Sequence, residues 1–142
     1  MPSTKLRYYY WEIFSFLAER RSILDLQHED LSLSSEEEVE YRGVMKATLV
    51  FKGGSCLLVR ALLDDTAEIR EYDYAYIYLG PDGERIFQYD DASHHPELST
   101  HPHHRHRGPR PSRGADQAFA LDIPQVDFVT IVTKIEEEYL TD

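Results

Sequence analysis

Most of the histidines in this sequence fall in one short segment, from His94 to His106. An imidazole ring exchanges protons near neutral pH and also ligates metal ions. A cluster of histidines therefore suits acid–base catalysis, metal binding or phosphate binding. The alternative is a solvated polar loop without a site, because Pro96 and Pro102 interrupt regular structure and leave the segment without a core-facing side.

Cleavage of RNA without a metal is one reaction that such a cluster could perform. It requires a base for the proton of the 2′-hydroxyl, an acid for the leaving oxygen and a cation for the charge on phosphorus. The candidate catalytic residues are five histidines of this segment, namely His94, His95, His103, His104 and His106. The candidate phosphate-binding or substrate-binding residues are Arg60, Tyr74, Tyr76, Asp90, Arg105 and Arg107.

A divalent metal ion is a second use of the same segment, although the RNA cleavage just described requires no cofactor. Histidines two positions apart point the same way in an extended chain, and the segment offers two such pairs. No carboxylate inside the cluster stands at a spacing that is diagnostic of a metal motif. If a metal is bound, its expected ligands are His101, His103, His104 and His106.

Several of the supporting residues have a structural as well as a functional interpretation. Arg60 interrupts an apolar run and could pair with Glu71 or Asp90 across a sheet. Asp90 could orient a histidine or end a strand. Four tyrosines alternate strictly, so all are expected on one face of a strand, as a half-buried surface or as a platform for unpaired bases. These are Tyr72, Tyr74, Tyr76 and Tyr78.

The elements that position these residues are predicted to form an α+β fold. Gly53-Gly54 and the turn sequence from Gly80 to Gly83 separate strand-like runs by links that are too short for parallel crossovers. Helical spacing of apolar residues predicts a helix before the strands, over 8–26, and another after them. The strand-like runs predict a four-stranded antiparallel meander with strands over 39–51, 56–63, 69–79 and 84–90. We expect a single domain, 1–142, made of an N-terminal helix region (1–33), the antiparallel sheet (39–91), a long His/Arg-rich loop (92–117) and a C-terminal helix (124–140).

Composition and charge restrict the class of protein. A length of 142 residues with 42% hydrophobic residues suits one folded domain. The lone Cys56 cannot form an internal disulfide, and no stretch is apolar for the about 18 residues that a membrane helix needs. We therefore expect a cytoplasmic protein that does not enter a membrane. The net charge of −11 opposes general nucleic-acid binding, yet one basic patch is formed by Arg105, Arg107, Arg110 and Arg113.

Several of these residues, taken in order, are similar to the pattern of a known family. Arg60 is followed by Tyr72-x-Tyr74-x-Tyr76, then by the run from Phe87 to Pro96 and the run from Ser99 to His106. This order resembles the TumE family of toxin–antitoxin toxins over about residues 41–106. Its most specific part is D-x-A-x-H-H-P followed by H-P-H-H-x-H. The matching positions are Arg60, Tyr74, Tyr76, Tyr89, Asp90, His94, His95, Pro96, His103, His104 and His106.

The resemblance implies a small prokaryotic toxin that is neutralised by an antitoxin with a helix-turn-helix DNA-binding domain. It also makes RNA the expected substrate, cleaved by endoribonuclease action. The chain departs from the family pattern at Ala61 and Ala75, where a glutamate and a histidine are common. The competing interpretation is a non-catalytic binding or regulatory protein of the same fold, whose histidine loop binds a metal or a partner.

Overall fold

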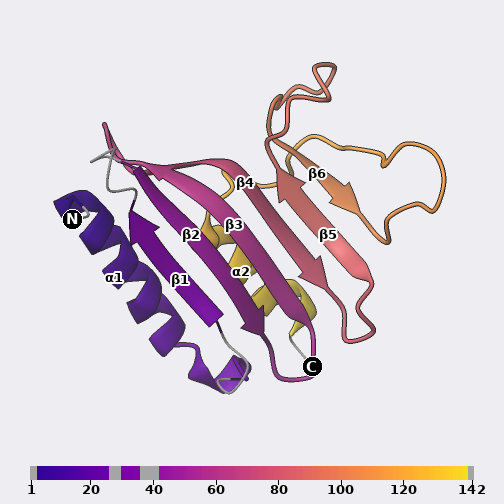
Figure 1. Cartoon of the computed structure of the whole chain (residues 1–142). Helices are drawn as coiled ribbons and strands as arrows, with labels where there is room; N and C mark the ends of the chain where they lie inside the picture. Colours follow the sequence, from indigo (N-terminus) through magenta and orange to yellow (C-terminus); the bar gives the residue numbers. More distant parts are fainter. Residues whose placement is uncertain (1–2, 26–29, 36–41, 141–142) are drawn as a thin grey trace.

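The computed structural model describes residues 3–25, 30–35 and 42–140 of the chain. Its strands form one antiparallel sheet whose spatial order is the sequence order, so the sheet is a meander (Figure 1). The elements are, in order, α1 (Thr4–Ala18), the 3-10 turn η1 (Arg21–Ile23), β1 (Asp30–Ser35), β2 (Arg42–Val50), β3 (Cys56–Asp64), β4 (Arg70–Leu79), β5 (Arg85–Asp90), β6 (His104–Arg107) and α2 (Phe128–Tyr139).

The structure confirms the predicted α+β class, with one helix before and one after an antiparallel meander. The sheet has six strands within the described residues, however, and the predicted number of four is wrong. One additional strand, β1, lies in and just after the predicted N-terminal helix region, and the other, β6, lies inside the predicted loop 92–117. The sequence did not predict β6, because its four residues alternate histidine and arginine and include no apolar side chain.

Both helices are shorter than predicted. α1 begins after Ser3, whose hydroxyl caps the first turn, and it ends at Ala18. α2 begins only at Phe128, because the carboxylate of Asp127 accepts a hydrogen bond from an amide of the first turn and so caps the helix. Neither described helix is long and apolar enough to cross a bilayer. The start of the predicted first strand, 39–41, lies outside the described residues.

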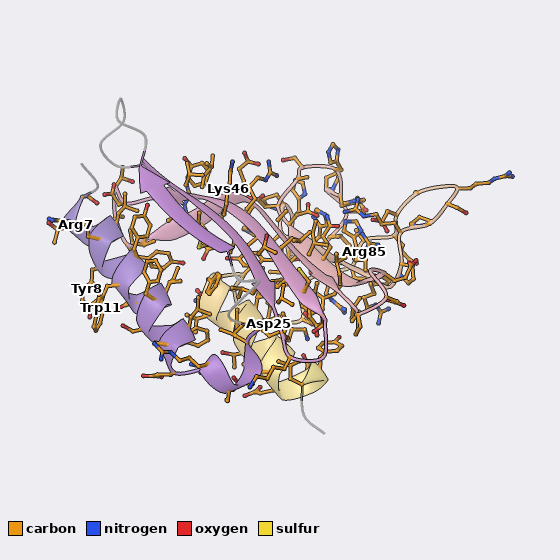
Figure 2. The ribbon with its side chains drawn as sticks, turned by 60° about the horizontal axis from the view of Figure 1, so that its bottom comes forward. Arg7, Tyr8, Trp11, Asp25, Lys46 and Arg85 are labelled. Carbon is orange, nitrogen blue, oxygen red and sulfur yellow. The ribbon has the colours of Figure 1, made fainter. Side chains whose placement is uncertain are left out.

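Both helices pack on the same face of the sheet and enclose the hydrophobic core with it. Figure 2 shows α1 and α2 on the lower side of the sheet. Burial alternates along the strands, as in β3, so one set of side chains enters the core and the other lies on the opposite, open face. The largest fully buried side chains are Tyr76, Tyr78, Tyr89, Phe51, Phe128, Leu6, Ile13, Met45, Leu49, Leu57, Leu63 and Ile131.

A β-bulge in β4 interrupts the alternation of the tyrosines. Arg60 of β3 pairs with Ala75, whereas Leu62 pairs with Tyr72, so β4 has one residue more than β3 between these pairs. Asp73 lies in this bulge with a φ of 46°. The expectation that all four tyrosines share one face is therefore wrong, because Tyr72 lies on the open face. Of these four tyrosines, the three that enter the core are Tyr74, Tyr76 and Tyr78.

The open face carries a row of residues that crosses the sheet from β2 to β6. Residues directly opposite each other on neighbouring strands lie on the same face. The pairs are Lys46 with Arg60, Arg60 with Ala75, Ala75 with Asp90, and Asp90 with His104. The meander thus brings polar residues from distant parts of the sequence onto one surface, away from both helices.

Candidate active site

A cleft of about 850 Å³ lies on the open face, over β4, β5 and β6 and beside the loop that follows β5. β5 and β6 pair so that Asp90 stands opposite His104 and Gln88 stands opposite His106. His104 and His106 point the same way because they are two residues apart on a strand. Among the residues that line the cleft are Arg60, Asp90, His94, His95, His104 and His106.

His104 and Asp90 form the buried centre of this cleft. His104 Nε2 lies 2.9 Å from Asp90 Oδ1, and the His104 side chain is only 2% exposed. On the other side of the ring, Nδ1 donates a hydrogen bond to the backbone carbonyl of Pro102 at 3.0 Å. A carbonyl oxygen only accepts, so Nδ1 carries a proton and Nε2 is the ring nitrogen that faces the carboxylate. The carboxylate of Asp90 thus lies where it would stabilise a proton on His104 Nε2.

His106 presents a ring nitrogen with a lone pair to the same cleft. Its Nδ1 donates to the backbone carbonyl of Gln117 at 3.0 Å and lies 3.3 Å from Asp116 Oδ2. Its Nε2 is 3.6 Å from Asp90 Oδ2, which is beyond hydrogen-bond distance. Burial lowers the pKa of His106, although the Gln117 carbonyl and Asp116 oppose this change. The neutral ring therefore carries its proton on Nδ1 and leaves Nε2 available as a base.

His95 is the third histidine of the cluster and approaches from the loop after β5. Its ring centroid lies 4.8 Å from that of His104 and 6.0 Å from that of His106. One ligand atom from each of the three rings lies within 4.8 Å of the others. His95 is half-buried, and its Nδ1 lies 3.5 Å from a carboxylate oxygen of Glu97. Such a group can exchange protons with a bound substrate or hold a metal ion.

The model of one protein family, described as toxin TumE, matches residues 16–138. The chain belongs to the TumE toxin family. The match includes every strand of the sheet and every residue that lines the cleft, and it confirms the resemblance seen in the sequence. Membership in a family of this kind implies an antitoxin as the partner. No curated protein and no solved structure matches the chain.

The TumE-family fold separates the predicted catalytic histidines. His95, His104 and His106 come together, and the exposed His94 lies at the rim of the same cleft. His103 points to the opposite side of β6, where its ring stacks on Tyr74 and its Nδ1 lies 2.8 Å from the Tyr74 hydroxyl. His101 is exposed and does not line the cleft. The group of histidines that could hold a metal in the structure is His95, His104 and His106. It includes two of the four expected ligands, His104 and His106, and it does not include His101 or His103.

Three of the predicted substrate-binding residues have structural contacts in this TumE-family chain. Arg105 Nε donates to a backbone carbonyl after β6 at 3.1 Å. The guanidinium of Arg107 lies over the ring of Phe119, 4.1 Å from its centroid. Tyr76 is fully buried, and its hydroxyl donates to Glu71 inside the core. The predicted residues that line the cleft are Arg60, Tyr74 and Asp90.

One ion pair beside the cleft was not predicted from the sequence, and one of its members, Asp116, lines the cleft. Arg85 donates two hydrogen bonds to the carboxylate of Asp116, at 2.8 and 2.7 Å, and the Arg85 side chain is 2% exposed. Asp116 directly precedes Gln117, whose carbonyl fixes the ring of His106. Arg85 also donates to Gln88 Oε1 at 3.2 Å, and Gln88 in turn donates to the carboxylate of Asp90 at 2.9 Å. No local pattern marks this pair, since its members are 31 residues apart.

Proposed function

We propose that this TumE-family toxin is an endoribonuclease that uses two histidines as its base and its acid. The observation that carries the proposal is the contrast between two imidazole rings whose centroids lie 5.0 Å apart in one cleft. His106 offers Nε2 with a lone pair, because its Nδ1 donates to a carbonyl. His104 is the proposed acid, because its Nε2 lies 2.9 Å from Asp90 Oδ1 and the carboxylate would stabilise a proton on that nitrogen. One ring is thus able to accept a proton while the other donates one.

In the proposed reaction, His106 Nε2 takes the proton of a ribose 2′-hydroxyl. The 2′-oxygen then forms a bond to the neighbouring phosphorus, and the bond between phosphorus and the 5′-oxygen breaks. The leaving 5′-oxygen receives a proton from Nε2 of His104, the nitrogen that faces Asp90. The products are one strand with a 2′,3′-cyclic phosphate and one with a 5′-hydroxyl.

Arg60 is the proposed anchor for a phosphate next to the one that is cleaved. It lines the cleft in the same row as His104, three strands away. At the usual spacing of strands this is about 14 Å along the sheet, a separation that the long arginine side chain shortens. A guanidinium stays charged at all relevant pH values and can bind two phosphate oxygens at once.

Purified protein and a synthetic RNA test the assignment. His104→Ala and His106→Ala are each expected to slow cleavage by about 10²- to 10⁴-fold, the usual contribution of a general acid or base. The matched control is His101→Ala, which removes an exposed histidine of the same segment from outside the cleft. The released ends should carry 2′,3′-cyclic phosphates. Equal cleavage by wild type and by both cluster variants would reject these roles.

The antitoxin partner is proposed to carry a helix-turn-helix DNA-binding domain, as the resemblance of the sequence implies, and the toxin to act on cytoplasmic RNA. Co-expression of the protein encoded beside this chain should restore the growth of bacteria that produce the toxin, and the two proteins should co-purify. A neutralising partner without such a domain would show that the partner type is wrong.

A metal-binding role for the same histidines is the second candidate function. Two ring nitrogens, Nδ1 of His104 and Nδ1 of His106, donate to backbone carbonyls, and this is how metal-binding histidines are commonly oriented. Their Nε2 atoms would act as ligands together with His95. Elemental analysis of protein purified without chelators tests this role. One zinc per chain that is lost in His95→Ala, with no RNA cleavage, would favour a binding protein over an enzyme.

A further inference from the structure

Two cations stand directly opposite each other on the open face of the sheet, outside the histidine cluster. Lys46 of β2 pairs in register with Arg60 of β3, and both side chains are exposed. Figure 2 shows Lys46 on the upper side of the sheet, opposite the two helices. Neither the candidate acid–base pair nor its supporting contacts include Lys46.

Placing these two cations side by side costs stability in the free protein. Like charges on directly opposite residues of an antiparallel pair repel each other. In the part of the chain that the structure describes, the ion pairs involve neither Lys46 nor Arg60. The chain as a whole has 26 acidic residues and a net charge of −11, so carboxylates are abundant. A bound anion between the two side chains would remove the repulsion.

The surface around the two cations is shaped to hold more than a small ion. A second hollow of about 500 Å³ lies over β2, β3 and β4, and Lys46, Thr48, Leu58, Arg60, Ala75 and Ile77 are among its lining residues. Arg60 and Ala75 line both this hollow and the cleft of the histidines, so the two spaces are contiguous. The floor is apolar at Leu58 and Ile77, where a base or a sugar could pack.

The position of Lys46 fits a strand that continues beyond the cleft. Lys46 lies four strands from His104 in the same row, which is about 19 Å along the sheet. A single nucleotide held at His104 and His106 cannot reach so far. A longer single strand that crosses the sheet would pass Arg60 first and Lys46 next.

We propose that Lys46 and Arg60 form a phosphate subsite that binds the backbone of single-stranded RNA upstream or downstream of the cleaved bond. The hollow beside them receives the adjoining nucleotide. This subsite rests on the proposed function in one respect, namely that the ligand of the cleft is RNA. It extends the binding surface from β6 across the sheet to β2.

The affinity for a nucleic-acid strand that cannot be cleaved tests the phosphate subsite without depending on catalysis. The probe is a fluorescent single-stranded oligonucleotide with 2′-deoxyribose throughout, titrated by anisotropy at a series of salt concentrations. Lys46→Gln should weaken binding and reduce the slope of log K against log salt by about 0.7, the contribution of one phosphate contact to a single strand. The matched control is Lys52→Gln, which removes an exposed lysine from the turn between β2 and β3.

Each outcome bears on the subsite independently of catalysis. An unchanged salt slope in Lys46→Gln, or a slope that falls equally in Lys52→Gln, would overturn the subsite while leaving the roles of His104 and His106 intact. A salt slope that is reduced only in Lys46→Gln would support the subsite even if the wild-type chain cleaved no RNA. Cleavage of RNA provides a second comparison. A two-nucleotide RNA is too short to reach Lys46, so wild type and Lys46→Gln should cleave it equally. A longer RNA should be cleaved less efficiently by the variant.

Discussion

Glu71 of β4 binds the first backbone amide of α2, since its Oε2 accepts a hydrogen bond from Phe128 N at 3.0 Å. Tyr9 of α1 donates to the same oxygen at 2.6 Å, and Tyr76 donates to the other carboxylate oxygen. One carboxylate thus connects both helices to the sheet. Burial raises the pKa of Glu71 to about 7, and its three hydrogen-bond donors offset only part of the loss of hydration.

Stability is therefore expected to fall as the pH rises from 4.5 to about 7. The unfolded chain releases the Glu71 proton near its ordinary pKa of 4.5, whereas the folded chain keeps it until about pH 7. In that window the folded state binds more protons, so raising the pH favours unfolding, by about 3 kcal/mol in total. Urea unfolding at pH 4.5 and 8 measures the difference. Glu71→Gln should lack this component, and an identical pH dependence in the variant would contradict the role of Glu71.

Arg85 is expected to act on the site through the loop that it anchors. Arg85→Lys keeps the charge but loses the paired hydrogen bonds to Asp116, which should lower the free energy of unfolding by about 2 kcal/mol. The Gln117 carbonyl would then hold His106 less firmly, so ring ¹⁵N shifts should report a mixture of His106 tautomers. Arg110→Gln, which removes an exposed donor to Gln88, is the control and should leave the tautomer unchanged. A single tautomer in Arg85→Lys would count against this positioning role.

Asp90→Asn removes the carboxylate that would stabilise a proton on His104, and it keeps the size of the side chain in the cleft. The asparagine amide can donate to His104 Nε2, so the ring would remain neutral and hold no proton for the leaving oxygen. RNA cleavage should fall by about 10²- to 10⁴-fold, while circular dichroism shows an intact fold. Asp82→Asn, in the exposed turn before β5, serves as the control. Retained activity in Asp90→Asn would place the acid elsewhere.

Lys46→Gln should stabilise the free protein even as it weakens nucleic-acid binding. Removing one of two opposed cations relieves their repulsion, which is worth about 0.5 kcal/mol for a cross-strand pair. The gain should shrink at high salt because exposed charges are screened. Urea unfolding at low and high salt measures it. A loss of stability would show that Lys46 has a favourable contact in the free state.

The sequence was sufficient to predict much of the sheet, because β2, β3, β4 and β5 are strand-like runs rich in apolar and aromatic residues, and glycine-containing turns separate β2 from β3 and β4 from β5. It was insufficient for β6, where histidine and arginine alternate without an apolar signal. That omission affected the site directly. On a strand, His104 and His106 share one face and His103 takes the other, so recognising β6 would have removed His103 from the cluster.

Other features depended on contacts that no local pattern encodes. The bulge at Asp73 reverses the faces of Tyr72 and Tyr74, and the carboxylate of Asp91 stabilises it by accepting hydrogen bonds from the amides of Asp73 and Tyr74 at 2.9 and 3.0 Å. The pair of Arg85 and Asp116 depends on how the chain returns after β6. Such features become visible only when the tertiary fold brings the two partners together.

The meander order has a consequence for the synthesis of the toxin. Each strand pairs with the one made just before it, so the histidines of β6 join the sheet last. His106 additionally requires the carbonyl of Gln117, and the core requires Phe128 of α2. A chain still being translated lacks these groups until residue 128 has been added. On the ribosome, the cleft is therefore not assembled until β6, Gln117 and α2 have all been synthesised.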